Sequence, residues 1–179
     1  WNKSSKFDIR KVEGLNNVRV YYKLDNIFNQ YNNEYSIEDI DKGLRLIGWY
    51  KSMDIPVDEE IHDDELMLKD KYLLTRFNQK SANEGFLYVL FYMALMVSKD
   101  TPKIFAIDNI DSVLNPKLCE KIMAYLVELA KKYDKQLFLT TQNPAILDGI
   151  NLHDDEEKLF VVSRNKKGKT KVKALLAEN

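Results

Sequence analysis

The sequence lacks several features that would identify common protein classes. It contains one cysteine, Cys119, so no disulfide can form within the chain, and this favours a reducing, cytoplasmic setting. The two histidines, His62 and His153, have no metal-ligand spacing around them, so nothing indicates a zinc site. No apolar run approaches the roughly 20 residues that cross a bilayer, and we expect no membrane partner. With 27 basic and 28 acidic residues, the net charge of -1 gives no whole-chain argument for binding nucleic acid.

The chain has 179 residues, of which 45% are hydrophobic, as in an ordinary globular domain. We expect a peripheral helical or irregular segment over residues 1–60 and the main lobe over residues 61–179. In the first segment, apolar and polar residues alternate in NVRVYYKL, which predicts a strand. A helix is predicted from Ser36, which forms a capping-box pattern with Asp39, through Met53 to a stop at Pro56. The stretch DDELMLKDKYLLTRF then predicts one or two strands, with a turn at Lys69 and Asp70.

Helices and strands alternate in the second part of the chain. Residues 83–98 are apolar almost all round, which predicts a buried helix. A continuous apolar strand, Ile104–Ile107, precedes an amphipathic helix over residues 116–133 and a second buried strand, QLFLTT, from Gln136. The segment AILDGI predicts a short helix, and KLFVVSRNKKGKTKVKAL predicts a hairpin with its turn at residues 165–168. This order predicts an α/β fold with a parallel-sheet βαβ core, a right-handed crossover and a terminal β-hairpin.

Polar residues follow both predicted core strands. Asp108, Asn109 and Asp111 follow the first strand, and Gln142 lies in TTQNP after the second. The carboxyl ends of parallel strands share one edge of a sheet, where ligands usually bind. Asp108 is therefore a candidate Mg²⁺ ligand, and Gln142 is a candidate contact for a phosphate or its attacking water. The structural alternatives are an aspartate that caps a turn and an Asn-Pro pair that starts one.

The segment SANEGF opens the first buried helix. A helix N-terminus offers free N–H groups and the positive end of a dipole, so it can bind phosphate. Asn83 can cap this helix, and Gly85 permits close approach of a ligand to the backbone. By themselves these residues indicate only a helix start.

In this order, the three clusters resemble the C-terminal half of ABC-type ATPases, the class that includes SMC, RecF and OLD-like proteins. The closer likeness is to bacterial AAA-family ATPases of the AAA15 and OLD-like kind, and it covers about residues 61–179. ANEG looks like the signature motif, and IFAIDN looks like a Walker B strand with Asp108 as the magnesium acid. SVLNP, which contains Asn115, looks like the D-loop, and TTQNP looks like the switch that normally carries histidine.

The resemblance implies the C-terminal lobe of an ABC-type P-loop NTPase that binds ATP and Mg²⁺ between two head-to-tail subunits. Asn83, Glu84 and Gly85 would meet the γ-phosphate of the partner's nucleotide, and Asn115 would sense the partner. No GxxxxGK[ST] motif occurs in the chain, so the loop that binds the phosphates is expected in an upstream half of the same protein. The start at Trp1 rather than Met agrees with that expectation. DNA is a further candidate partner, and DNA-related or phage-defence work would fit this class.

Two positions depart from the family pattern. Asn109 stands where the catalytic glutamate normally follows the Walker B aspartate, and an amide cannot accept a proton as a general base. Gln142 stands at the switch histidine, and Asp111 is a candidate substitute for the missing base. Whether the full-length protein hydrolyses ATP is therefore open, and this chain alone is expected to be inactive.

The sequence also fits two other functions. One is a catalytically degenerate module that keeps the ATPase fold for protein interaction. The other is a metal nuclease of the TOPRIM type with acids from DNID, although no convincing earlier glutamate is present. The basic residues of the terminal hairpin indicate either a solvated tip or a contact with a phosphate backbone: Arg164, Lys166, Lys167, Lys169, Lys171 and Lys173.

Overall fold

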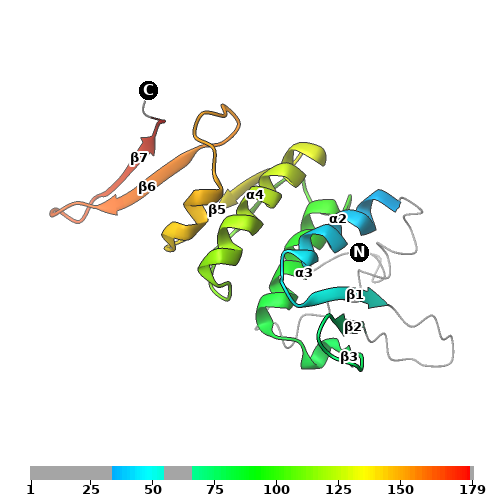
Figure 1. The fold of residues 1–179 in the computed structure, drawn as a ribbon. Coiled ribbons are helices and arrows are strands. Elements are labelled where there is room, and N and C mark those ends of the chain that lie inside the picture. Colours follow the sequence, from blue (N-terminus) through cyan, green and yellow to red (C-terminus); the bar gives the residue numbers. More distant parts are fainter. Residues whose placement is uncertain (1–33, 55–65, 178–179) are drawn as a thin grey trace, which may run out of the picture.

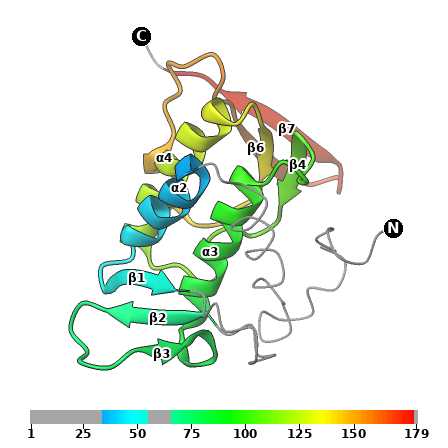
Figure 2. The same ribbon diagram turned by 90° about the vertical axis from the view of Figure 1, so that its right-hand side faces the viewer.

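The computed structural model describes residues 34–54 and 66–177. The three helices α2, α3 and α4 lie between a three-stranded antiparallel sheet at one end and a projecting two-stranded hairpin at the other (Figure 1). Figure 2 shows α2 and α4 stacked beside α3, with the sheet β1-β2-β3 below them. The predicted strand NVRVYYKL and His62 lie outside the described residues. No helix among the described residues is long and apolar enough to cross a membrane.

The first helix is shorter than the sequence predicts. Helix α2 covers Glu34–Arg45 and buries Ile40 and Leu44 in the core. The prediction of one helix from Ser36 to Met53 was wrong at both ends. Ser36 lies inside the helix, and Met53 belongs to the strand β1 (Tyr50–Asp54).

Strand β1 forms because a partner strand satisfies its backbone, although its apolar spacing also fits a helix. It pairs antiparallel with β2 (Met67–Asp70), which pairs in turn with β3 (Phe77–Asn78). The predicted turn at Lys69 and Asp70 was wrong, since both residues still pair with β1. The chain reverses in the following segment, where the Asp70 carboxylate accepts a hydrogen bond from the Tyr72 N–H at 2.7 Å.

The two long helices of the second part confirm the sequence predictions. Helix α3 covers Glu84–Val97 after its N-cap Asn83, and α4 covers Pro116–Lys132 after its N-cap Asn115. Each asparagine accepts a hydrogen bond from an N–H of the first helical turn, as helix caps do. Helix α4 is amphipathic as predicted, and its apolar face is buried: Leu118, Ile122, Tyr125, Leu126 and Leu129.

One hydrophobic core joins the expected N-terminal segment to the expected lobe. Residues of α2 and β1 pack in the same buried cluster as α3 and α4. The carboxylate of Asp39 on α2 pairs with the Lys132 ammonium at 2.7 Å, and the Tyr125 hydroxyl donates to the Asp39 carbonyl at 2.9 Å. The division near residue 60 stays a prediction.

The parallel pair of the predicted βαβ unit is present. Strands β4 (Ile104–Ile107) and β5 (Gln136–Leu139) pair in register, with Ile107 opposite Leu139. The expectation that both strands are buried was wrong for one face of the pair. Ile104 and Phe138 keep 60% and 58% of their surface exposed, because within the described residues the core covers only the opposite face.

The C-terminal part begins with a short helix that packs on α4. This 3₁₀ helix, η4 (Pro144–Gly149), corresponds to the predicted AILDGI helix. The hairpin then pairs β6 (Leu159–Arg164) with β7 (Thr170–Leu175) in antiparallel register, as predicted. Its turn is closed by the bond from the Gly168 N–H to the Asn165 carbonyl at 2.9 Å, with Gly168 at a φ of 76°.

Candidate functional site

The ends of β4 and β5 bring two polar loops together, as the parallel pairing predicts. Asp108 and Asn109 follow β4, and Thr140 follows β5. The Thr140 hydroxyl donates to Oδ1 of Asp108 and accepts the Asn109 backbone N–H at 2.9 Å. We call the group Asp108, Asn109, Asp111, Thr140, Thr141 and Gln142 the strand-end cluster. A single hydroxyl therefore orients the candidate magnesium acid and fixes the backbone after it.

Asn109 has an unusual backbone. Its φ is 49°, in the left-handed region that asparagine tolerates better than most residues. Its side-chain amide donates to Oδ2 of Asp108 at 3.4 Å, and both side chains are exposed. An amide in this place can donate and accept hydrogen bonds, but it cannot take a proton at neutral pH.

Asp111, the candidate substitute base, is held by the neighbouring loop. The Thr141 hydroxyl donates to Oδ1 of Asp111 at 2.5 Å, and the Asn143 N–H donates to the same hydroxyl at 3.0 Å. This bond orients the carboxylate and engages one of its two oxygens. Gln142 is exposed between these two loop residues, at the same end of the sheet.

Buried side chains of α3 and α4 form hydrogen bonds with the loops that carry the strand-end cluster. The Tyr92 hydroxyl of α3 donates to the carbonyl of buried Ile110 at 3.1 Å. Burial, with smaller contributions from Tyr88 and Asp111, raises the pKa of Tyr92 above its usual value, so this donor keeps its proton. Asn143 donates to the sulfur of buried Cys119 at 3.6 Å, and burial also raises the pKa of that thiol. Cys119 therefore serves packing.

The candidate signature residues occupy a separate position. The Asn83 side chain accepts the Phe86 N–H at 2.8 Å, so one of its polar atoms is already used as a cap. A methyl group on Gly85 would lie 3.2 Å from the Val113 carbonyl, which places the start of α3 against the D-loop-like segment. In the described part of the chain, no hydrogen bond joins Asn83 or Gly85 to the strand-end cluster.

Charge at the start of α3 bears on its use as a phosphate site. Glu84 is exposed in the first turn, where a carboxylate already complements the helix dipole. A phosphate at this helix start would face that negative charge. Asn115, the candidate D-loop sensor, is exposed and accepts the Leu118 N–H at 3.0 Å.

The donor set of the strand-end cluster suits magnesium better than a soft metal. It offers two carboxylates, two hydroxyls and two side-chain amide oxygens, and Mg²⁺ prefers oxygen ligands while keeping several waters. Over residues 34–54 and 66–177, no three His, Cys, Asp or Glu side chains gather as a metal cage. Asp108 would therefore act as a single protein anchor and would need phosphate oxygens to complete a site.

Sequence reasoning missed Thr140, Thr141 and Tyr92. The two threonines were visible in TTQNP, but only the register of β4 and β5 pairs each of them with an aspartate. Tyr92 lies in an apolar helix and gives no polar signal of its own.

Comparison with known proteins gives a family match and a structural likeness. A family model described as "AAA domain, putative AbiEii toxin, Type IV TA system" matches residues 13–148. No curated protein matches the chain significantly.

The chain is similar in structure to two solved structures from work on SMC ATPases. One comes from work on ATP-driven dimerization and DNA-stimulated activation of SMC ATPases. It is 15% identical with a TM-score of 0.55, over 84% of this chain and 89% of that one. The other is an Smc head domain with an extended coiled coil, bound to the C-terminal domain of ScpA, from Pyrococcus furiosus. It is also 15% identical, with a TM-score of 0.53, over 86% of this chain and 40% of that one. The chain therefore has a mixed α/β fold that resembles an SMC ATPase head.

Proposed function

The chain belongs to the AAA-domain family associated with AbiEii and type IV TA systems, and we propose that it supplies one side of an ABC-like ATP site. One observation supports this most strongly. Asp108 stands at the carboxyl end of an in-register parallel strand pair, with its carboxylate held by Thr140 from the neighbouring strand. This is the edge at which open α/β sheets bind ligands.

In the proposed site, Asp108 anchors Mg²⁺, which neutralises phosphate charge when bound. Thr140 keeps the carboxylate in one orientation, and Gln142 orients the attacking water or the γ-phosphate. Asn109 contributes hydrogen bonds without taking a proton. Asp111 is the candidate carboxylate for that step, and the Thr141 hydroxyl donates a hydrogen bond to one of its oxygens.

The remaining parts of the site are proposed to come from elsewhere. The printed sequence contains no P-loop motif, so we propose that a P-loop segment outside these 179 residues cradles the phosphates. The start of α3, with Asn83, Glu84 and Gly85, would face the nucleotide of a second copy. Asn115 and its neighbours would lie at that homodimer interface. These elements together would form the C-terminal lobe of an ABC-type NTPase over residues 61–179.

The family description and the structural neighbours suggest the biological setting. The family description names a toxin of type IV TA systems, which supports the proposal of a defence role. One structural neighbour comes from work on DNA-stimulated SMC ATPases, which supports DNA as a proposed partner.

A second candidate is an interaction module that binds nucleotide without hydrolysing it. Asn109 favours this alternative, because an amide offers no base at the position that follows Asp108. The nuclease alternative gains no support, since within the described residues no third acid joins Asp108 and Asp111 in a metal cluster.

The test compares the intact protein with its Asp108→Ala variant. Single-turnover hydrolysis of Mg-ATP should fall to background in the variant, because the metal loses its protein anchor. Asp155→Ala removes an equally charged, exposed acid from the loop before β6, where it pairs with Lys158, and should leave the rate unchanged. Equal rates for Asp108→Ala and the unmodified protein would contradict the proposal. The interaction module would be favoured by a different result. In that case the unmodified protein does not hydrolyse ATP but dimerises when ATP is present, and Asp108→Ala weakens this dimerisation.

A further inference from the structure

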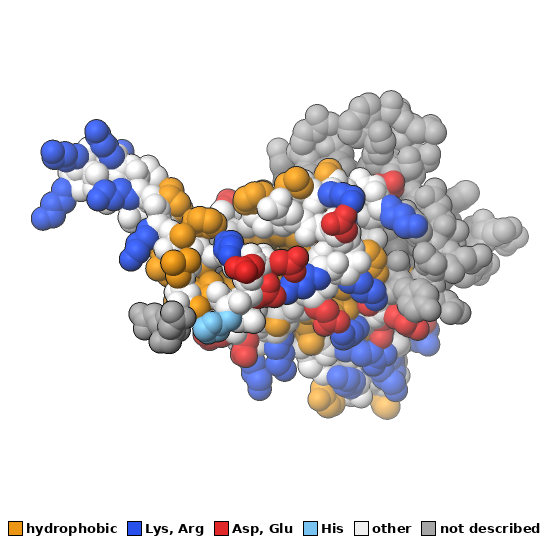
Figure 3. Space-filling model, turned by 90° about the horizontal axis from the view of Figure 1, so that it is seen from above, with side chains coloured by type: hydrophobic (Ala, Val, Ile, Leu, Met, Phe, Trp, Pro, Cys, Tyr) orange, Lys and Arg blue, Asp and Glu red, His pale blue; other side chains and the backbone are white. Residues whose placement is uncertain are grey.

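The β6–β7 hairpin is an exposed arm with a concentration of positive charge. It carries Arg164, Lys166, Lys167, Lys169, Lys171 and Lys173, while residues 159–175 contain no acid. Nearly every residue of the two strands is exposed. Figure 3 shows the arm projecting from the body, with basic side chains gathered at its far end.

The five lysines of the arm are free to meet an external anion. Within residues 34–54 and 66–177, none of them has a carboxylate partner within ion-pair distance, although lysines elsewhere do, such as Lys42 with Glu128 at 2.5 Å. Arg164 is used differently, because its Nε donates to the Gly168 carbonyl at 2.9 Å. The charges of the arm are therefore not neutralised by the part of the chain that the structure describes.

The strand register sorts the side chains by face. Val161 pairs with Lys173 and Ser163 pairs with Lys171, so the two lysines of β7 project from the same face of the hairpin. We call this face the lysine face. Phe160, Val162, Val172 and Ala174 share the opposite face. Two residues along a strand span about 6.8 Å, so the two lysines form a short row of charge that leads toward the tip.

The turn holds the other lysines in place. The Asn165 side chain accepts the Lys167 N–H at 2.9 Å and the Lys169 N–H at 3.0 Å. The backbone that carries the tip lysines is thus ordered, which lowers the entropy cost of binding.

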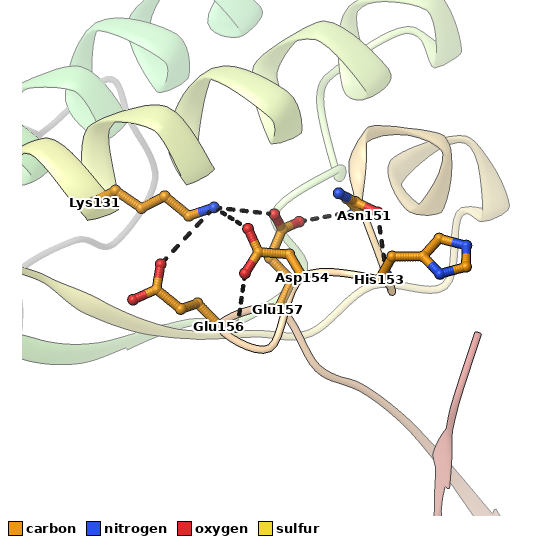
Figure 4. Close-up of polar contacts among 6 residues, drawn as sticks. All are labelled: Lys131, Asn151, His153, Asp154, Glu156 and Glu157. Atoms are coloured by element: carbon orange, nitrogen blue, oxygen red, sulfur yellow. Dashed lines mark hydrogen bonds and ion pairs between the residues drawn. The ribbon is translucent and has the colours of Figure 1, made fainter.

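The root of the arm is anchored, and it is acidic. Lys131 of α4 contacts Asp154 and lies 3.9 Å from Glu156 and 3.5 Å from Glu157 (Figure 4). Glu157 in turn accepts the Asn151 N–H at 2.9 Å. The acidic loop therefore fixes the arm to the body and repels a polyanion from its root, which leaves the lysine face and the tip as the attractive surface.

We propose that the lysine face and tip of the β6–β7 arm bind the phosphate backbone of double-stranded DNA without reading base sequence. A two-stranded ribbon is one of the elements that a B-DNA major groove admits, and lysines supply the phosphate contacts. The lysine face offers few side chains that could discriminate bases. This inference extends the DNA partner of the proposed function, but its test needs no nucleotide, so the two can fail separately.

The test is fluorescence anisotropy of this chain with a short labelled duplex of arbitrary sequence, in salt from about 50 to 200 mM. The double variant Lys171→Gln/Lys173→Gln should bind more weakly, and its plot of log affinity against log salt should be shallower by about 1.8, or about 0.9 per lost contact. The matched control Lys51→Gln/Lys121→Gln removes the same charge from exposed sites elsewhere and should match the unmodified chain. Circular dichroism checks that each variant is folded.

Three results would overturn the proposal. These are no salt-dependent binding by the unmodified chain, equal losses in both double variants, or an unchanged slope in the hairpin variant. A hairpin variant that changes the oligomeric state, measured by light scattering, while DNA binding stays intact would assign the arm to protein contact instead. Asp108→Ala should keep full DNA binding, which separates this surface from the ATP site.

Discussion

Asn109 combines two properties that matter for its chemistry. It has no proton-accepting group, and its backbone lies at a φ of 49°. Most side chains other than asparagine and aspartate are strained in this region by about 1–2 kcal/mol. A substitution here therefore changes both the chemistry and the backbone, and a useful experiment has to separate the two effects.

We expect Asn109→Glu to raise ATP turnover of the intact protein if the site is a weakened ATPase of the usual design. The new carboxylate would act as general base, which contributes up to about 10²–10⁴-fold. Asn109→Gln imposes similar backbone strain without a base and is the matched control. The measurement compares the single-turnover rates of the two variants. If Asn109→Glu is no faster than Asn109→Gln, this position does not limit catalysis.

Lys135 should make stability depend on pH. Its ammonium donates to the Leu95 carbonyl at 2.9 Å and the Ser98 carbonyl at 2.7 Å, at the end of α3, and burial lowers its pKa from 10.5 to about 8. Below pH 8 both the folded and unfolded states are protonated, and the folded state carries the full cost of burying the charge. Between pH 8 and 10.5 only the unfolded state keeps the proton, so the free energy of unfolding should rise with pH.

The measurement is urea unfolding across this pH range for the unmodified chain and for Lys135→Met, which cannot titrate at this position. The difference in unfolding free energy between the two should shift in favour of the unmodified chain as pH rises. A difference that stays constant with pH would mean that Lys135 keeps an ordinary pKa when folded.

At the scale of elements, η4 depends on close backbone contact with α4. A methyl group at Gly149 would lie 2.5 Å from the Glu120 carbonyl oxygen and 3.0 Å from the Ala124 nitrogen. Both atoms belong to the backbone of a packed helix, so they cannot move aside as a flexible side chain would.

Gly149→Ala should therefore lower the free energy of unfolding by about 1–3 kcal/mol, the usual cost of overpacking. Gly48→Ala is the control, since a methyl group there meets nothing within 4 Å. Chemical denaturation of both variants tests this. Equal stabilities would show that η4 shifts away from α4 at little cost.

At the scale of the whole molecule, the strand-end cluster is one part of a nucleotide site. Asp108 is a single metal anchor, the start of α3 carries Glu84, and the printed sequence has no P-loop motif. These parts cannot replace a phosphate cradle, so binding of a nucleotide by this chain should be weak.

Calorimetry of this chain with Mg-ATP should show a dissociation constant no tighter than about 1 mM, which corresponds to roughly -4 kcal/mol. Measurement with and without magnesium would reveal any contribution of Asp108. Micromolar binding would contradict the view that a P-loop segment must be supplied from elsewhere.

The sequence by itself determined the elements whose signals are local. Asn83 precedes a long apolar pattern and caps the predicted helix, and the hairpin turn lies at residues 165–168 as predicted. These predictions succeeded because a cap or a tight turn is stabilised by residues only a few positions apart.

Tertiary structure decided what depends on contacts between distant residues. Tyr50 and Met53 fit a helical spacing, yet pairing with β2 makes that segment a strand. The exposed faces of Ile104 and Phe138 depend on which side of the sheet the helices cover. The pairing of Thr140 with Asp108 and of Thr141 with Asp111 joins residues about thirty positions apart, and only the parallel register places each hydroxyl against its carboxylate.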